Sequence, residues 1–299
     1  MLFTDGIGGY DFAKDPAVVK YKGRYYLYYT AADFTSDGRI EKHIIGIAVS
    51  DDMENWEIIG RMNPVGAVEQ KGLCAPGAIV IGDKLHLFYQ SYGTGVNDSI
   101  CHAVSTDGVN FERNKTNPIY RAGESWSSGR AIDADVVIFG GRLLLYIATR
   151  DKSGRVQMIG AGACDVNSDF SKDCWSEISA APILKPELDW EKNCIEAAAT
   201  ICKDGRIYMF YGGAYNCEPQ QIGVAVSQDG VNFTRLSDRP FFTNGSTGEW
   251  NSRESGHPYV FGDDDGRIWL FYQGCDDNSI WRLSKMEIAI ENGKVSVLP

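Results

Sequence analysis

Three carboxylic acids stand at comparable points of the chain, each directly before an apolar run. Asp15 precedes PAVV, Asp133 precedes ADVV and Glu196 precedes AAA. A charged side chain next to an apolar run that is buried in the fold is costly unless it has a partner or a function. One carboxyl can protonate a leaving oxygen while another activates water, and a third acid beside the proton donor raises its pKa. The hydrolysis of a glycosidic bond needs the first two of these groups, and the third can assist the proton donor.

The spacing of these acids follows a repeat. Five similar strand-like runs occur in order, YYLYYT, LHLFYQ, LLLYIA, IYMFYG and IWLFYQ, and their fifth residues are separated by 60, 58, 64 and 61 positions. Asp15 and Asp133 lie 14 residues before these anchors, and Glu196 and His257 lie 15 before theirs. Ala75 stands in the second repeat, so the acids are not a cap that every repeat requires. We therefore predict that these positions share one register and meet at one mouth of a central channel.

Each repeat is typical of a four-stranded antiparallel sheet. Short Gly- or Asp-containing pairs, which favour two-residue hairpins, separate the first two strands at Lys22-Gly23, Gly82-Asp83, Gly140-Gly141, Asp204-Gly205 and Asp265-Gly266. A later SxDG-type turn recurs from Ser50, Ser105 and Ser227, and we interpret it as structural. Helix is expected only in short pieces near Asp189. A period of about 60 residues predicts an all-β, five-bladed propeller with four-stranded blades around a channel. We expect this propeller to form one catalytic domain over residues 1–299.

The composition excludes some classes of function. The net charge is −11 and the pI is about 4.9, which disfavours nucleic acid and suits a neutral carbohydrate partner. No apolar stretch is long enough to cross a bilayer, so no membrane partner is expected. The compartment stays open between the cytoplasm and, if a leader has been removed, the periplasm or the exterior. The eight cysteines show no regular framework and favour free thiols, with a bridge between Cys164 and Cys174 left open.

The chain resembles glycoside hydrolase family 43, a family of five-bladed propeller glycosidases. The resemblance rests on KDPAVV from Lys14, IDADV from Ile132, Glu196 ahead of DGRIY, and Gly256-His257. It implies that Asp15 is the general base, that Asp133 tunes the pKa of the acid, and that Glu196 is the general acid. The chain departs from the family where Ala-Ala follows Glu196 in place of Gly-Pro and where Ala follows Asp133 in place of Pro.

Further residues near these motifs are candidates for substrate binding. Loops that enter the inner strands lie at the mouth of the channel, so an Arg there could bind sugar hydroxyls and a Trp could stack on a sugar face. The candidates are Trp126, Arg130, Arg253, Glu254 and His257, followed by the weaker Phe34, Tyr215 and Trp250. The resemblance also implies that His257 could hold a central Ca²⁺ or Na⁺ through water. The alternative is a histidine hydrogen-bonded to the channel wall. Asp135 is expected to make a structural pair deeper in the channel.

Four functional hypotheses follow. The leading one is an inverting glycosidase, with no required cofactor, that acts on arabinose- or xylose-containing polysaccharides or oligosaccharides such as xylan, arabinoxylan or arabinan. A retaining propeller glycosidase is the second, and the separation of the two carboxyls distinguishes it from the first. A glycoside phosphorylase is the third and needs a cationic phosphate pocket, to which Arg130 and Arg253 could contribute. A non-catalytic carbohydrate-binding propeller is the fourth, favoured if an arginine held Glu196 ionised. The oligomeric state stays open.

Overall fold

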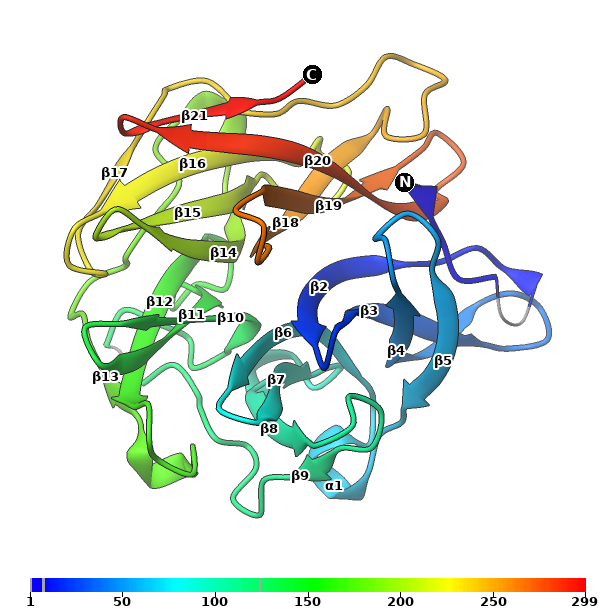
Figure 1. Cartoon of the computed structure of the whole chain (residues 1–299), viewed down its shortest axis with the longest axis horizontal. Helices are drawn as coiled ribbons and strands as arrows, with labels where there is room; N and C mark the ends of the chain where they lie inside the picture. The colour runs from blue at the N-terminus through cyan, green and yellow to red at the C-terminus, as the bar shows by residue number, and fades with distance from the viewer. Residues whose placement is uncertain (1, 7–8, 124) are drawn as a thin grey trace.

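The computed structural model describes residues 2–6, 9–123 and 125–299 and contains five antiparallel sheets arranged around one axis (Figure 1). Each sheet is one blade, and in the first four blades the strands follow one another outward from the axis in chain order. The predicted five-bladed propeller is therefore confirmed.

The first four blades each contain four strands. Blade 1 consists of β2 (Lys14–Tyr21), β3 (Arg24–Phe34), β4 (Ile40–Ser50) and β5 (Glu57–Met62). Blade 2 consists of β6 (Leu73–Ile81), β7 (Lys84–Ser91), β8 (Ile100–Ser105) and β9 (Glu112–Arg113). Blade 3 consists of β10 (Ile132–Phe139), β11 (Arg142–Arg150), β12 (Gln157–Asp165) and β13 (Ser176–Glu177). Blade 4 consists of β14 (Ile195–Lys203), β15 (Arg206–Gly213), β16 (Gln221–Ser227) and β17 (Phe233–Arg235).

Blade 5 closes the ring with strands from both ends of the chain. Its inner strands are β18 (Glu254–Gly262), β19 (Ile268–Cys275) and β20 (Trp281–Glu291), and β20 pairs with both β1 (Leu2–Phe3) and β21 (Lys294–Val297). The N-terminal strand thus ties the start of the chain to the last blade, beside β20 in Figure 1. The described helices are α1 (Gly66–Glu69) and the 3-10 turns η2 (Gly95–Asn97), η3 (Lys172–Cys174) and η4 (Asp189–Glu191). The last of these lies where a short helix was predicted.

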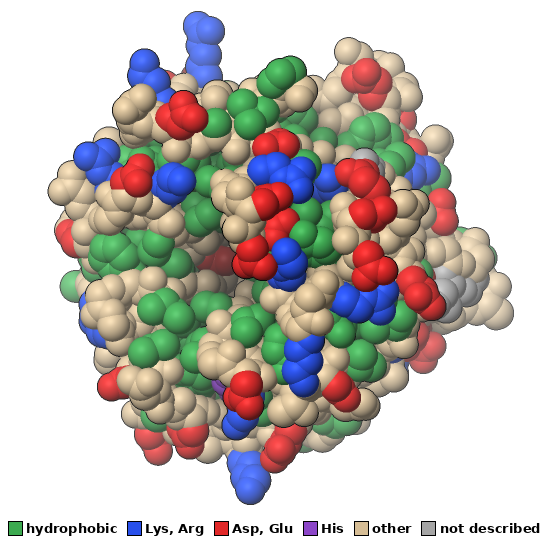
Figure 2. Space-filling model, viewed as in Figure 1, with side chains coloured by type: hydrophobic (Ala, Val, Ile, Leu, Met, Phe, Trp, Pro, Cys, Tyr) green, Lys and Arg blue, Asp and Glu red, His purple; other side chains and the backbone are tan. Residues whose placement is uncertain are grey.

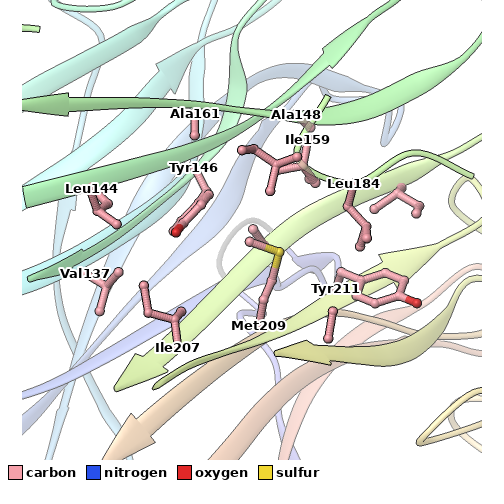
Figure 3. Packing of buried hydrophobic residues seen from close by; sticks show 14 of the residues in the cluster. Val137, Leu144, Tyr146, Ala148, Ile159, Ala161, Leu184, Ile207, Met209 and Tyr211 are labelled. Carbon is pink, nitrogen blue, oxygen red and sulfur yellow. The ribbon is translucent and has the colours of Figure 1, made fainter. Parts of the chain in front are cut away.

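The hydrophobic core consists of five clusters, one between each pair of neighbouring blades. Figure 3 shows the cluster between blades 3 and 4, where Leu144 and Tyr146 face Ile207 and Met209. All four side chains are fully buried. One sheet alone cannot bury both of its faces, but a ring of sheets buries each inner face against the next blade. This packing fixes the inner strands around the channel.

The SxDG turns have the structural role that the sequence indicated. In blade 2 the Ser105 hydroxyl accepts a hydrogen bond from the Gly108 amide, and Asp107 accepts from the amides of Val109 and Asn110. The Tyr28 hydroxyl of blade 1 donates to the Gly108 carbonyl at 2.8 Å. These turns therefore connect neighbouring blades at a distance from the channel mouth.

The cysteines answer one question that the sequence left open. All eight cysteines are free thiols, so Cys164 and Cys174 form no bridge. Among the described residues, no helix combines the length and the apolar character that a membrane span requires. On the face in Figure 2, basic side chains are interspersed with acidic ones.

Candidate active site

A β-bulge interrupts the inner strand of every blade at the same place. The pairing of the inner strand with the middle strand shifts there, and one residue takes a left-handed backbone conformation. The residues at this position are Asp15 (φ 51°), Ala75 (φ 45°), Asp133 (φ 55°), Ala197 (φ 53°) and His257 (φ 44°). Such conformations are uncommon for residues with a side chain, and bulges re-aim side chains near functional sites. The fold therefore sets the direction of Asp15, Asp133 and His257.

This geometry corrects the predicted register of the acids. In blade 4 the bulge residue is Ala197, and Glu196 lies one position earlier, paired with Gly212. The residue in the same position of blade 1 is Lys14, which is paired with Thr30. Glu196 and His257 both lie 15 residues before the fifth residue of their aromatic runs, but they are not in the same position of the strand. The β18–β19 hairpin is longer than the other four, so in blade 5 the count from the bulge to the aromatic run is longer as well.

All three acids nevertheless line one cavity of about 160 Å³ at the channel mouth. Side chains from all five blades contribute to its wall, so the predicted meeting of sequence-distant residues occurs. Its charged or titratable lining side chains, besides Asp15, Asp133 and Glu196, are Lys14, His43, Cys74, Tyr92, Arg130, Arg150, Tyr215 and His257. The cavity is therefore polar and has both acids and bases within reach of a bound sugar.

His257 connects two of the acids. Its Nε2 lies 3.3 Å from Asp15 Oδ1 and 3.4 Å from Asp133 Oδ1. Burial by itself would lower the pKa of His257, but Asp15 and Asp133 raise this pKa to about 9. The imidazolium in turn acts on Asp15: burial would raise the pKa of this acid, yet His257, Lys14 and the Thr30 hydroxyl hold it below its usual range. Asp15 is therefore a carboxylate at neutral pH.

Glu196 is shifted in the opposite direction. Burial and the nearby charge of Asp133 raise the pKa of Glu196 above its ordinary value. Its Oε1 accepts a hydrogen bond from Gln220 Nε2 at 2.6 Å, and its Oε2 accepts one from the Gln157 amide. Two carboxyl groups in one cavity whose pKa values move apart are suited to separate roles as base and acid.

A set of inter-blade hydrogen bonds positions the bulges. The Asp15 amide donates to Gln273 of the preceding blade at 2.9 Å, and the Asp133 amide donates to Gln90 at 2.6 Å. Thr30 accepts from the Ala75 amide in the same way. The corresponding residue of blade 4 is Gly212, which has no side chain to accept a hydrogen bond from the bulge of the next blade. Gln220 takes its place and accepts from the His257 amide at 2.9 Å. Three of these acceptors, Thr30, Gln90 and Gln273, could have been found from the sequence, because each is the polar last residue of its aromatic run.

The predicted substrate-binding residues divide into two groups. Arg130 and His257 line the cavity, and Arg130 is paired with Asp98 at 2.9 Å. Tyr215, one of the weaker candidates, also lines it.

Trp126, Arg253 and Glu254 lie outside the cavity wall. Glu254 is fully buried and accepts a hydrogen bond from Gln273 Nε2 at 2.6 Å, so it supports the glutamine that holds the Asp15 amide. Arg253 donates to Ser279 at 2.9 Å. The Trp126 indole nitrogen is buried. These positions do not favour direct contact with a sugar in the cavity.

Three cavity residues that the sequence interpretation missed carry or influence charge. Lys14 is half-buried, its Nζ lies 4.2 Å from the centre of the Trp281 ring, and Asp15, Glu254 and Glu196 raise its pKa against the effect of burial. Burial and the charge of Lys14 lower the pKa of His43 to about 4, so His43 is neutral. Arg150 donates to Gln157 at 3.1 Å and thus supports a partner of Glu196.

Comparison with known proteins places this geometry in a family. The model for Glycosyl hydrolases family 43 matches residues 10–289. The chain belongs to glycoside hydrolase family 43. As a member of family 43 it is a glycosidase, as the resemblance implied.

The chain is also similar to individual proteins. It is 30% identical over 221 residues to a 1,2-beta-oligomannan phosphorylase of Thermoanaerobacter sp. (strain X514), covering 71% of this chain and 67% of that protein. A thermostable family-43 glycoside hydrolase superposes with a TM-score of 0.74 at 21% identity, over 99% of this chain and 96% of the other. An endo-1,4-beta-xylanase of Bacteroides thetaiotaomicron superposes with a TM-score of 0.72 at 22% identity, over 96% and 94% of the two chains. At these identities the two structures show the shared fold.

The residues around His257 do not fit a cation held through this histidine. Its Nε2 lies 3.3 Å from Asp15 Oδ1 and 3.4 Å from Asp133 Oδ1, so this nitrogen already faces two carboxylate oxygens of the channel wall. Among the residues that the structure describes, no group of three or more His, Cys, Asp or Glu side chains is arranged as metal ligands. The geometry favours the alternative prediction, a histidine bonded to the channel wall.

Proposed function

We propose that this family 43 protein is an inverting glycosidase that releases arabinose or xylose residues from plant oligosaccharides or polysaccharides. The observation that carries the proposal is the opposite shift of two pKa values in one cavity: that of Asp15 is lowered and that of Glu196 is raised. Hydrolysis of a glycosidic bond, with inversion or with retention, needs one ionised and one protonated carboxyl at the same time. We place inversion first because the family resemblance implies that Asp15 is a general base.

In the proposed reaction Asp15 removes a proton from water while the water oxygen forms a bond to the anomeric carbon. The bond from that carbon to the glycosidic oxygen breaks, and Glu196 gives its proton to the departing oxygen. Asp133 keeps Glu196 protonated through its negative charge. His257 holds Asp15 and Asp133 in place through Nε2. A second proton transfer through solvent restores both carboxyl groups. Each transfer to or from a positioned side chain contributes roughly 10²–10⁴-fold to the rate.

The size of the cavity supports action on a single terminal sugar. Its volume of about 160 Å³ is below the roughly 300–1,000 Å³ of pockets for larger ligands. A cavity of this size suits one pentose unit better than a chain of them. We therefore propose exo action, in which one residue enters the cavity and the rest of the substrate stays outside.

A binding-only propeller is less consistent with the site. Such a protein was expected to hold Glu196 permanently ionised, for example by an arginine. Glu196 is only 6% exposed and its partners are the amides of Gln157 and Gln220. Burial and the charge of Asp133 raise the pKa of Glu196 in spite of the Gln220 hydrogen bond, which lowers it, so no cation holds this acid ionised as a binding-only protein would require.

Phosphorolysis is a second candidate, favoured by one specific observation. Lys14, Arg130 and Arg150 all line the cavity, and two similar proteins of Thermoanaerobacter sp. (strain X514) are described as phosphorylases, a 1,2-beta-oligomannan phosphorylase and a beta-1,2-mannobiose phosphorylase. In that reaction phosphate oxygen would replace water at the anomeric carbon, and Glu196 would still protonate the leaving oxygen. Two of the cations already have partners, since Arg130 pairs with Asp98 and Arg150 bonds to Gln157. We therefore place hydrolysis first.

One experiment distinguishes these reactions. Aryl arabinofuranosides, aryl xylopyranosides, arabinoxylan oligosaccharides and β-1,2-mannobiose are incubated with the protein, with and without inorganic phosphate, and the first product is followed by NMR. Free sugar of inverted configuration without phosphate supports the proposal. A sugar phosphate that forms only with phosphate present would establish phosphorolysis, and retained configuration would make Asp15 a nucleophile. No turnover of any pentoside would refute the proposed substrate class.

A further inference from the structure

A second and larger concavity lies beside the catalytic cavity at the same end of the blades. It has a volume of about 700 Å³ and is formed by the segment before β2, the β3–β4 loop and the start of β20. In Figure 1 the first two of these segments lie side by side at the right-hand edge. We call it the aromatic groove, and its main side chains are Tyr10, Phe12, Phe34, Ile40 and Trp281.

The rings of the groove form a connected surface. Tyr10 and Phe34 lie with their ring centres 5.0 Å apart, and Phe12 packs edge-on against Phe34 at 6.3 Å. Gly38 lies so close to the Tyr10 ring that a Cβ there would approach it to 2.7 Å. The contact fixes the position of Tyr10 while leaving 42% of its surface exposed. Large apolar side chains that gather at a surface concavity mark binding sites more often than isolated ones do.

The groove and the cavity share a wall. Phe12 of the groove packs against His43 of the cavity with a centre-to-centre distance of 5.8 Å. Lys14 of the cavity lies over the Trp281 ring of the groove at 4.2 Å. The groove therefore borders the cavity at His43 and Lys14.

The polar groups at the groove suit a neutral, hydroxyl-rich ligand. Asp11, Asn278 and Ser279 line it and are exposed, which offers acceptors and donors beside the aromatic rings. Arg253 donates to Ser279 and so supports this rim, which gives a structural place to a residue that the sequence indicated for substrate binding. Sugars combine apolar ring faces with hydroxyl groups, and aromatic side chains with nearby polar groups match both.

We propose that the aromatic groove binds the sugar units of an oligosaccharide that lie outside the catalytic cavity, on the leaving-group side of the cleaved bond. The proposal rests on the proposed function, because it assigns the groove to the substrate of the same site. It follows that the protein selects longer oligosaccharides over disaccharides through Tyr10, Phe34 and Trp281. The cavity supplies the chemistry and the groove supplies the preference for chain length.

The test compares long and short substrates in matched variants. For the parent protein, kcat/KM is measured on an aryl pentoside and on a pentasaccharide of the same sugar, and their ratio is taken. We expect the ratio to fall roughly tenfold in Tyr10→Ala and in Phe34→Ala, and to recover in Tyr10→Phe, which keeps the ring. Leu236→Ala is the control, since Leu236 is a similarly exposed apolar residue at a different concavity. An unchanged ratio in Tyr10→Ala and Phe34→Ala would overturn the proposal.

A binding measurement separates failure of the groove from failure of the proposed function. Xylopentaose, arabinopentaose and mannopentaose are titrated calorimetrically into the Glu196→Gln protein, with and without Tyr10→Ala. Weaker binding in the double variant supports the groove even if no pentoside is hydrolysed. Equal binding in both proteins, or no binding of any of the three, refutes the groove, whatever activity the parent shows.

Discussion

Lys14 and Glu196 occupy the same position of the inner strand in blades 1 and 4, one residue before the bulge. The structure thus places a cation and an acid at matched points of one cavity wall. Lys14 contributes to lowering the pKa of Asp15 and opposes the increase in the pKa of Glu196. A single lysine therefore acts on both groups of the proposed acid–base pair.

Replacing this lysine should move the pH profile. In Lys14→Met the lost positive charge allows the pKa values of Asp15 and Glu196 to rise, so both limbs of the kcat/KM profile should shift to higher pH. The profile of the parent and of the variant is measured on an aryl pentoside. Lys20→Met is the control, since Lys20 lies at the other end of β2 and pairs with Asp263. A profile in Lys14→Met that overlays the parent would contradict the electrostatic role.

Substitution of the proposed acid or base should lower kcat far more than substitution of a neighbouring buried acid. Asp15→Asn and Glu196→Gln should each lower kcat by about 10²–10⁴-fold, because each removes one proton transfer. Asp135→Asn is the matched control: Asp135 lies two residues after Asp133 on β10 and accepts from the Thr200 amide and hydroxyl, a role that an asparagine oxygen can keep. Steady-state kinetics with circular dichroism checks activity and fold together. Comparable losses in all three variants would argue against the assignment.

His257 should make stability depend on pH. Its pKa is raised to about 9 in the folded protein from the ordinary 6.5, so the folded state binds a proton that the unfolded state releases between these values. The stabilisation is complete below pH 6.5 and is lost as the pH rises through about 9; at most it is on the order of 3 kcal/mol. Urea unfolding of the parent and of His257→Gln at several pH values measures this. The difference between the two proteins should shrink from pH 6 to pH 10, and a constant difference would contradict the prediction.

Gly77 should tolerate no side chain. A Cβ at this position of β6 would lie 2.2 Å from the Ala134 carbonyl oxygen of β10, next to the bulge that carries Asp133. Gly77→Ala should therefore destabilise the protein by about 1–3 kcal/mol and reduce activity as well, because β10 must move. Gly60→Ala is the control, since a Cβ there makes ordinary contacts of 3.5 Å or more. Thermal unfolding with activity assays compares the two, and equal melting temperatures would show that the inner strands yield easily.

The sequence by itself determined the propeller and its chemistry-bearing residues. The period of the aromatic runs predicted five blades because each blade needs the same hairpins and the same buried strands. The acids before the inner strands indicated a functional site, because a charged side chain next to a buried apolar strand is costly unless it has a partner or a function. Asp15, Asp133 and Glu196 were named on this basis, His257 was named from its position in the fifth repeat, and all four line the cavity.

Only the tertiary structure decided how these residues are arranged. Glu196 and His257 lie at the same distance in sequence from their aromatic runs, and this count could not show that the hairpin in blade 5 is longer. Glu196 was therefore placed at the bulge, the position that Ala197 occupies in the structure. Contacts across the ring have no local signal either: His257 meets Asp15 and Asp133 from another blade, and Glu254 turns away from the cavity to hold Gln273. The pKa values follow from these contacts, because burial and neighbouring charges exist only once the blades have closed around the axis.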